Sequence, residues 1–164
     1  MPTIVEIPIS YSRHDVWQDL SVPDRELVEA ARAAAGKAYA PYSEFQVGAA
    51  LRLADGTVVT GNNQENASYP AGICAERTAL HAAMSQNSDA VVTAMAVVVP
   101  SVGKEPPVSP CGICRQVLAE QEDRQKENGV PLRLLLAVPD GPVYEIASAS
   151  QLLPIRFSKK ALKR

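Results

Sequence analysis

The chain has 164 residues, of which 46% are apolar and 21% charged, and its formal net charge is -2. This length fits one domain that can bury a core without help from disulfides or a metal. The negative charge argues against tight binding to a nucleic-acid backbone, and no segment approaches the roughly 18 apolar residues of a membrane span. A secretory signal is not recognisable, and three cysteines are too few for a disulfide framework. We therefore expect a cytoplasmic protein that binds neither membranes nor nucleic acids.

The first part of the chain predicts an arm, a helix and a hairpin. Residues 1–22 show little helical periodicity, and we expect an irregular arm ahead of a single domain over residues 23–164. Pro23 and Asp24 suit the first turn of a helix, and Ala40-Pro41 should end it. From residue 45 to 61 apolar side chains alternate with less apolar ones around an Asp-Gly pair, which predicts a β-hairpin.

The remainder alternates between helix and strand. Helices are predicted over 74–87 and 111–127, the second ending at Asn128-Gly129, and strands over 91–100, 132–138 and 143–147. Strands that alternate with helices favour right-handed crossovers and a partly parallel sheet. We therefore predict an α/β fold, a three-layer α/β/α sandwich around a mixed sheet of roughly five strands.

The three cysteines all fall where a loop meets the start of a predicted helix. Cys111 and Cys114 are three residues apart and share one face of the first helical turn, while Cys74 begins the other helix. Helix N-termini favour thiolates, and thiolates bind zinc. Structural zinc usually has four protein ligands, whereas catalytic zinc has three and keeps one position open.

Other interpretations of the cysteines remain open at this point. His81 lies about 10 Å along the helix from Cys74 and is too far for the same metal, but spacing does not exclude His14 as a fourth ligand. Cys74 alone would be a small buried hydrophobe. A lone CxxC also fits a redox pair, and a zinc or redox-switch module without enzymatic activity is one alternative function.

The combination of motifs is more specific than its parts. Cys-Ala-Glu at 74–76, followed by Pro-Cys-x-x-Cys at 110–114, matches the signature of zinc deaminases of nucleosides and nucleobases, with cysteine replacing the first histidine. Together with AYAPYSEFQVGAAL, GNNQENASYPAG and LLPIRF, these motifs make the chain similar to the small, homotetrameric, three-cysteine cytidine deaminases. The resemblance covers about residues 24–157.

The resemblance implies a function and a set of site residues. It implies hydrolytic deamination of cytidine, and of 2′-deoxycytidine, in pyrimidine salvage by a homotetramer with one zinc per subunit. Cys74, Cys111 and Cys114 would hold the zinc, Glu76 would carry protons, and Arg77 would steady the thiolates. The implied substrate contacts are Phe45, Asn63, Glu65, Ala75, Tyr69 and Phe157, the aromatic pair Tyr69 and Phe157 reaching a neighbouring subunit's site.

Each of these residues also has a simpler interpretation. Phe45 would more commonly be a core residue of its strand, while Asn63 and Glu65 would be solvated loop residues and Arg77 a solvated helix residue.

A deaminase acting on another amine, such as a purine base, uses the same zinc site, and an enzyme that edits RNA or DNA is a weaker alternative because the chain is acidic. The arm at 1–22 and the segment PSVGKEPPVS before Cys111 depart from the family pattern without touching a motif.

Overall fold

A computed structural model describes residues 2–101, 103 and 106–162, so Lys163 and Arg164 at the end of the predicted domain lie outside the described residues. One six-stranded sheet has the order β1-β6-β5-β4-β2-β3. No helix within the described ranges is long and apolar enough to cross a membrane. The strands are β1 (Ser12–His14), β2 (Gly48–Leu53), β3 (Val58–Asn62), β4 (Val92–Val98), β5 (Arg133–Ala137) and β6 (Val143–Ile146), and the α-helices are α1 (Val22–Ala35), α2 (Ala75–Gln86) and α3 (Gly112–Arg124).

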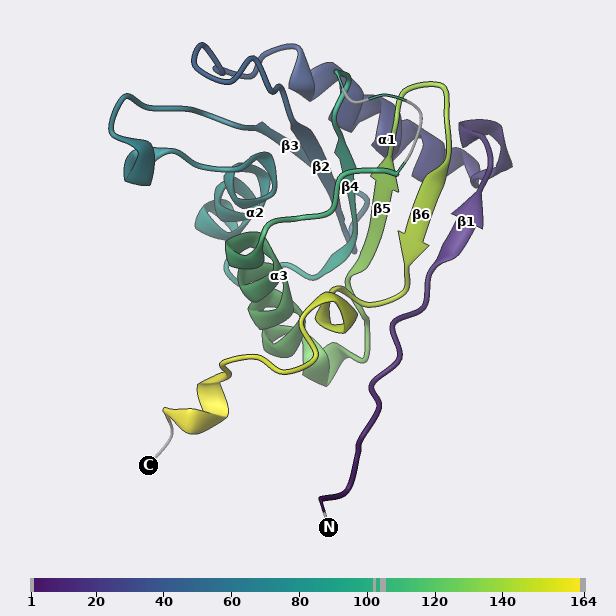
Figure 1. The fold of residues 1–164 in the computed structure, drawn as a ribbon, viewed down its shortest axis with the longest axis vertical. Helices are drawn as coiled ribbons and strands as arrows, with labels where there is room; N and C mark the ends of the chain where they lie inside the picture. The colour runs from purple at the N-terminus through teal and green to yellow at the C-terminus, as the bar shows by residue number, and fades with distance from the viewer. Residues whose placement is uncertain (1, 102, 104–105, 163–164) are drawn as a thin grey trace.

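The helices cover the two faces of the sheet unequally. α1 lies behind the sheet in Figure 1, whereas α2 and α3 lie side by side in front of it. Only β4 and β5 pair in parallel, and the chain crosses between them through α3. The other pairs are antiparallel. The predicted three-layer fold with a mixed sheet is confirmed, with six strands rather than about five.

The additional strand comes from the segment that we expected to be irregular. Ser12–His14 forms β1 at the edge of the sheet and pairs with β6. Trp17 and Leu20 are buried in the core, and the Trp17 indole N–H donates to the carbonyl of Val138 at 2.9 Å. A three-residue edge strand followed by one 3-10 turn carries no periodic signal, which is why the sequence did not predict it.

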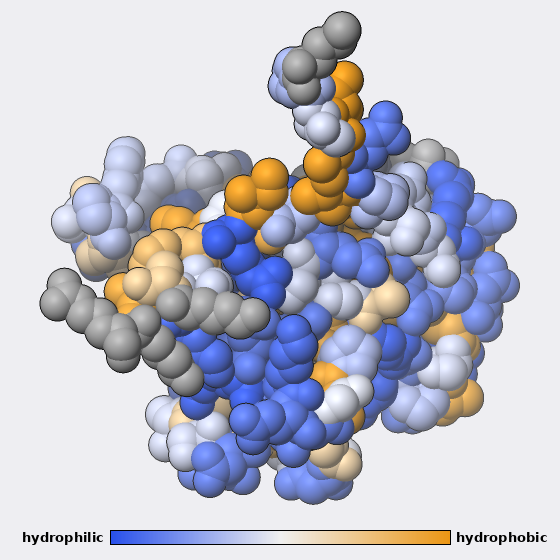
Figure 2. All heavy atoms as spheres, turned by 90° about the horizontal axis from the view of Figure 1, so that it is seen from below, coloured by the Kyte–Doolittle hydropathy of each residue, from blue (hydrophilic) through white to orange (hydrophobic). Residues whose placement is uncertain are grey.

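Residues 2–11 precede this strand and stay largely outside the core. Ile4, Val5, Ile7 and Ile9 are all exposed, although Tyr11 stacks on Tyr144 of β6 with ring centroids 4.4 Å apart. The arm extends away from the body in Figure 1, and Figure 2 shows hydrophobic residues on a protruding segment at this otherwise mainly hydrophilic end. The arm expected at the N-terminus is therefore much shorter than 22 residues.

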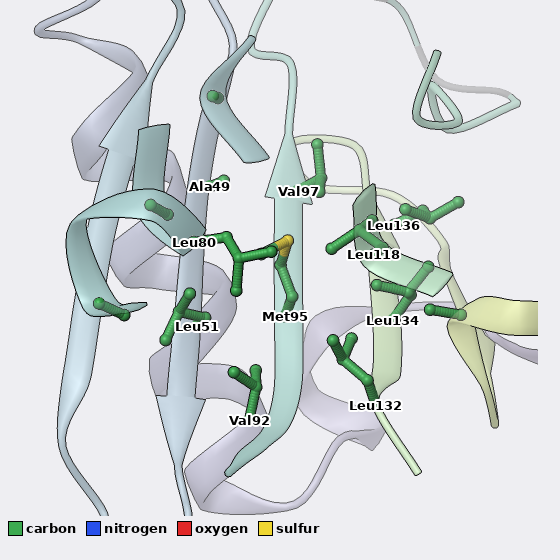
Figure 3. Packing of buried hydrophobic residues seen from close by; sticks show 14 of the residues in the cluster. Ala49, Leu51, Leu80, Val92, Met95, Val97, Leu118, Leu132, Leu134 and Leu136 are labelled. Carbon is green, nitrogen blue, oxygen red and sulfur yellow. The ribbon is translucent and has the colours of Figure 1, made fainter. Parts of the chain in front are cut away.

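The main core fills the space between the sheet and the pair α2 and α3. Leu51 of β2 and Met95 of β4 project toward Leu80 of α2, and Leu134 of β5 lies near Leu118 of α3 (Figure 3). A second cluster packs α1 against the opposite face. Burying both faces of β4 and β5 explains why their sequences are apolar apart from Thr93 and Arg133 near their beginnings.

Two glycines allow the helices to approach the sheet closely. A Cβ atom on Gly61 of β3 would lie 2.4 Å from the backbone nitrogen of Ala79 in α2. A Cβ atom on Gly48 of β2 would lie 1.9 Å from the carbonyl oxygen of Ala31 in α1. Neither neighbour is a flexible side chain, so these positions require glycine, and the contact at Gly61 fixes α2 against the sheet.

Most predicted element boundaries agree with the structure to within a few residues. The Asp55-Gly56 hairpin turn is confirmed, with Gly56 at a φ of 88°, and Gly129 at 68° ends the short 3-10 turn after α3. α1 stops at Ala35 instead of near Ala40, because Lys37 and Ala38 donate to carbonyls only three residues back.

Candidate active site

The cysteines occupy the N-terminal ends of the two helices on the same face of the sheet. Cys74 is the N-cap residue of α2 and Cys111 the N-cap residue of α3, while Cys114 lies in the first turn of α3. Neither N-cap side chain is used to cap its helix. Both sulfur atoms are therefore next to the unpaired N–H groups and partial positive charge of a helix start.

The three sulfur atoms form a cluster that fits a metal ion. All lie within 4.8 Å of one another, and the Cys74 and Cys111 sulfurs are 3.9 Å apart. Tetrahedral zinc with Zn–S bonds of about 2.3 Å holds its sulfur ligands about 3.8 Å apart. Among the described residues no further histidine, cysteine or carboxylate joins this cluster. The donor set and its spacing therefore suit zinc with three protein ligands.

Ionisation of the thiols points to the same conclusion. A hydrogen bond with the Cys114 thiol and the nearby Arg77 lower the pKa of Cys74 to about 5, although burial opposes this shift. The hydrogen bond to Cys74 and burial raise the pKa of Cys114 far above its ordinary range. Without a cation the Cys114 thiol thus keeps its proton, whereas a bound cation would favour its thiolate form.

Arg77 lies on α2 beside the cluster. Its Nη2 atom is 4.0 Å from the sulfur of Cys74, and its buried Nε has no hydrogen-bond partner among the described residues. The side chain is partly buried and directed toward the sulfurs, unlike a solvated helix arginine. Its positive charge is one of the causes that lower the pKa of Cys74.

Glu76 is the buried carboxylate of the site. It is 5% exposed and lies in the first turn of α2, two residues after Cys74. Burial raises its pKa above the usual value of 4.5, and the negative charge of Cys74 adds to this shift. Because it also lines the pocket described next, Glu76 can exchange a proton with a molecule held there.

A pocket of about 560 Å³ opens beside the cysteines. This volume suits a ligand of nucleoside size. Its walls come from the 42–47 segment, the loop between β3 and α2, the end of β4 and the loop before α3. The lining residues are Tyr42, Ser43, Phe45, Val47, Asn63, Gln64, Glu65, Asn66, Tyr69, Gly72, Ile73, Cys74, Glu76, Val97, Val108, Ser109 and Cys111.

Three of the predicted substrate contacts meet on one side of this pocket. Phe45 is 37% exposed and lines the pocket, so it is not a core residue of its strand. The Asn63 side chain accepts from the backbone N–H of Val47 at 2.8 Å and donates to the carbonyl of Phe45 at 2.9 Å. Glu65 accepts from the backbone N–H of Tyr42 at 2.9 Å. Neither polar side chain is merely solvated.

The other predicted contacts are more dispersed. Tyr69 lines the pocket but is 77% exposed, and Ala75 is buried as the first residue of α2. Phe157 lies away from the pocket, in a groove between α2 and α3 that His81 also lines. His14 binds Glu145 at 2.9 Å on the edge of the sheet, so neither histidine joins the cysteines.

The structure adds residues that the sequence analysis did not single out. Ser43 and Tyr42 contact Glu65, and Ser109 lines the pocket. Arg115 donates to the carbonyl of Pro110, to Ser109 Oγ and to the carbonyl of Leu152, which holds the loop before Cys111. The signal available for Tyr42, Ser43 and Arg115 was their position inside the recognised motifs, shortly before Phe45 and directly after the cysteine pair. Ser109 belongs to the segment that departs from the family pattern, so it had no such signal.

Comparison with known proteins agrees with this geometry. The model of the "Cytidine and deoxycytidylate deaminase zinc-binding region" matches residues 21–126. A cytidine deaminase of Halalkalibacterium halodurans is 46% identical over 137 residues, which are 82% of this chain and 95% of that protein. One from Sporosarcina psychrophila is 42% identical over 137 residues, covering 84% and 93% of the two chains.

A solved structure shares the fold. The crystal structure of cytidine deaminase from Burkholderia pseudomallei has a TM-score of 0.68 and 44% sequence identity, and covers 80% of this chain and 97% of that one. The family match includes both helix starts that carry the cysteines and the whole 42–47 segment. The chain therefore belongs to the cytidine deaminase family.

Proposed function

We propose that this protein is a zinc-dependent hydrolase that converts cytidine to uridine and ammonia. The observation that carries the proposal is a single pocket that joins Glu76 and the cysteine cluster to Phe45, Asn63 and Glu65. Glu76 and the cysteine cluster would supply the chemistry, and the other three residues would recognise a nucleoside. The relatives named above are called cytidine deaminases.

Cys74, Cys111 and Cys114 would hold one zinc per subunit, and Arg77 would offset the excess negative charge. Three thiolates and a divalent cation leave a net charge of -1 before the arginine is counted. The two helix N-termini each add roughly +0.5 charge. Zinc, when bound, supplies Lewis-acid activation of a water molecule at neutral pH.

Glu76 would carry the protons. Its carboxylate would take a proton from the water that bonds to C4 and deliver that proton to N3 of the pyrimidine. As the C4–N bond breaks, the carboxylate would transfer a second proton, from the new C4 hydroxyl, to the departing amino group. Its burial favours this role, because burial raises the pKa of the carboxyl and so makes the carboxylate a better proton acceptor. One side chain serves every step because all the proton positions surround C4 of the base.

The side of the pocket that carries Phe45, Asn63 and Glu65 would recognise the substrate. Phe45 would pack against the pyrimidine, Asn63 and Glu65 would bind ribose hydroxyls, and the backbone of Ala75 would read the base edge. If these contacts reach the 3′-hydroxyl, 2′-deoxycytidine is also a substrate. We further propose that the activity belongs to pyrimidine salvage in the cytoplasm. Among rival amines, a purine base would leave Asn63 and Glu65 without hydroxyl partners.

Tyr69 and Phe157 support a homotetramer. Both are strongly exposed, and Phe157 does not reach its own pocket. Large exposed aromatic side chains are typical of subunit interfaces. We propose that they complete the sites of neighbouring subunits, and that residues 23–164, together with β1, Trp17 and Leu20, form one catalytic domain behind a short arm.

The test is the loss of cytidine absorbance with zinc-loaded protein. The wild type should deaminate cytidine, and Glu76→Gln should lose about 10³-fold or more in kcat while still binding one zinc. Glu65→Gln should weaken the binding of cytidine much more than the binding of free cytosine.

Matched variants distinguish the alternatives. Glu120→Gln, a glutamate of α3 outside the pocket, should leave the rate unchanged. A zinc-loaded wild type that leaves cytidine and 2′-deoxycytidine untouched would contradict the proposal. Four protein ligands on the zinc, or a Cys111–Cys114 disulfide in the isolated protein, would instead support a structural or redox module.

A further inference from the structure

Ser43 joins two residues with different proposed roles. Its hydroxyl donates to Oε1 of Glu65 and accepts the backbone N–H of Phe45 at 3.1 Å. The backbone N–H groups of Tyr42 and Ser43 donate to the other oxygen, Oε2, at 2.9 and 3.3 Å. One hydroxyl thus lies between the carboxylate proposed for the sugar and the backbone that carries the ring proposed for the base.

The turn that holds Phe45 has an unfavourable backbone conformation. Glu44, between Ser43 and Phe45, has a φ of 57°, in the left-handed region that residues other than glycine rarely adopt. Its own N–H donates to the carbonyl of Ala40 at 3.0 Å. Such a conformation persists only when surrounding contacts hold it. Here those contacts come from Ser43 and Glu65.

Asn63 completes the support on the other side of Phe45. Its side-chain amide donates to the Phe45 carbonyl, and its oxygen accepts the N–H of Val47. The backbone of Phe45 is therefore fixed at its N–H by Ser43 and at its carbonyl by Asn63. Asn63, which is proposed to bind ribose, therefore also holds the backbone that carries the aromatic ring, and Glu65 contributes through Ser43.

We propose that Ser43 is a positioning residue that couples recognition of the sugar to recognition of the base. This inference rests on the proposed function. A carboxylate accepts about four hydrogen bonds, and the turn already supplies three to Glu65. Ser43 orients the remaining acceptor site toward a sugar hydroxyl and fixes the ring of Phe45 with the same hydroxyl group.

The position of Ser43 separates this role from a structural one. Tyr42, Ser43, Glu44 and Phe45 are all exposed, and none belongs to either core cluster. Removing the hydroxyl therefore leaves the core intact. The consequence is confined to the pocket, where Glu65 gains rotational freedom and the Phe45 N–H loses its partner.

Steady-state kinetics of the zinc-loaded chain provide the first test. Ser43→Ala should raise KM for cytidine about tenfold and change kcat by less than about threefold, since a hydrogen bond to a charged group is lost. Ser43→Thr, which keeps the hydroxyl, should recover most of the affinity. Ser43→Ala combined with Phe45→Leu should raise KM by less than the product of the single effects.

The coupling is overturned if the effects of Ser43→Ala and Phe45→Leu multiply, or if Ser43→Thr is as impaired as Ser43→Ala. Ser85→Ala is the matched control, because Ser85 is an exposed serine of α2 that does not line the pocket. Its kinetic constants should equal those of the wild type.

Amide hydrogen exchange in the substrate-free protein tests the positioning without using activity. The Tyr42 and Phe45 amides should be protected in the wild type, and Ser43→Ala should speed exchange at Phe45 about tenfold. Unchanged exchange would refute the positioning role even in an active enzyme. A wild type that exchanges as expected but leaves cytidine intact would refute the proposed function instead.

Discussion

Single residues at this site act through charge and geometry that are visible in their immediate contacts. Arg77 is the clearest example, because its guanidinium lies 4.0 Å from the Cys74 sulfur and has a buried nitrogen that finds no hydrogen-bond partner in the described part of the chain. A helix arginine at this position of the sequence has no distinguishing local pattern. The motif resemblance predicted its role, and the structure provides the physical basis for that prediction.

Arg77→Ala should keep the fold but weaken zinc binding by about tenfold, since one favourable charge interaction with the thiolates is lost. Competition with a chromogenic chelator measures this affinity. Arg77→Lys retains the charge and should fall between the wild type and the alanine variant. If Arg77→Ala binds zinc as tightly as the wild type, the proposed charge compensation is wrong.

At the scale of elements, the site depends on how closely α2 lies on the sheet. A Cβ atom on Gly61 of β3 would meet the backbone of Ala75 and Ala79 in α2, and Ala75 directly follows Cys74. The alternating pattern of the hairpin predicted the strand but not this contact. The direction of α2 relative to the sheet determines where Cys74 and Glu76 point.

Gly61→Ala should lower the free energy of unfolding by about 1–3 kcal/mol, because the added Cβ atom would clash with helix backbone. It should also weaken zinc binding, since α2 must move away from β3, which would shift Cys74 relative to Cys111 and Cys114. Thermal denaturation and chelator competition measure the two effects. Gly36→Ala is the matched control: it has a helical backbone and space for a Cβ atom, and should be neutral or slightly stabilising.

At the scale of the whole molecule, one network of ions links elements distant in the sequence. Asp24 of α1 accepts from Arg52 of β2 at 2.7 Å and from Arg133 of β5 at 3.0 Å. Arg133 also binds Glu145 of β6 at 2.7 Å, which in turn binds His14 of β1 at 2.9 Å. The network ties the arm's edge strand and α1 to the sheet, on the face opposite α2 and α3.

This network predicts a loss of stability in acid. Burial opposes ionisation of Asp24, but hydrogen bonds from Arg52 and Arg133 hold its pKa below the usual 3.8. Hydrogen bonds from His14 and Arg133 likewise lower the pKa of Glu145 below 4.5, against the effect of burial. The folded state then binds fewer protons than the unfolded state, so this contribution is present above about pH 4.5 and disappears as pH falls through the folded-state pKa values.

Asp24→Asn should cost about 2 kcal/mol at pH 7, because charged hydrogen bonds are lost, and should flatten the decline of stability below pH 4.5. Urea denaturation at several pH values measures both effects. Asp15→Asn, whose carboxylate is exposed and binds only the neighbouring Arg13, is a suitable control. An equally steep acid decline in Asp24→Asn would exclude Asp24 as its source.

Two truncations test how much of the N-terminal segment belongs to the folded body. Deleting residues 2–10 should change stability little, because their large side chains are exposed. Deleting residues 2–20 removes Trp17 and Leu20 from the core and should cost at least about 3–5 kcal/mol. Thermal melting compares them, and equal stability of the two truncated proteins would show that β1 and Trp17 are dispensable.

The sequence by itself determined the features that depend on local chemistry and on spacing along the chain. Apolar runs and turn residues predicted the α/β order of elements, and the cysteine motifs predicted three ligands at two helix starts. These patterns can be identified in the sequence alone because they arise from backbone geometry within a few residues.

Only the tertiary structure decided what depends on contacts between distant segments. It showed that β1 and Trp17 complete the sheet and core, that Phe45 faces the pocket instead of the core, and that Phe157 lies away from that pocket. It also brought Ser43 to Glu65, 22 residues further along the chain. Such contacts are set by the packing of whole elements on the sheet, and that packing leaves no periodic pattern in the sequence.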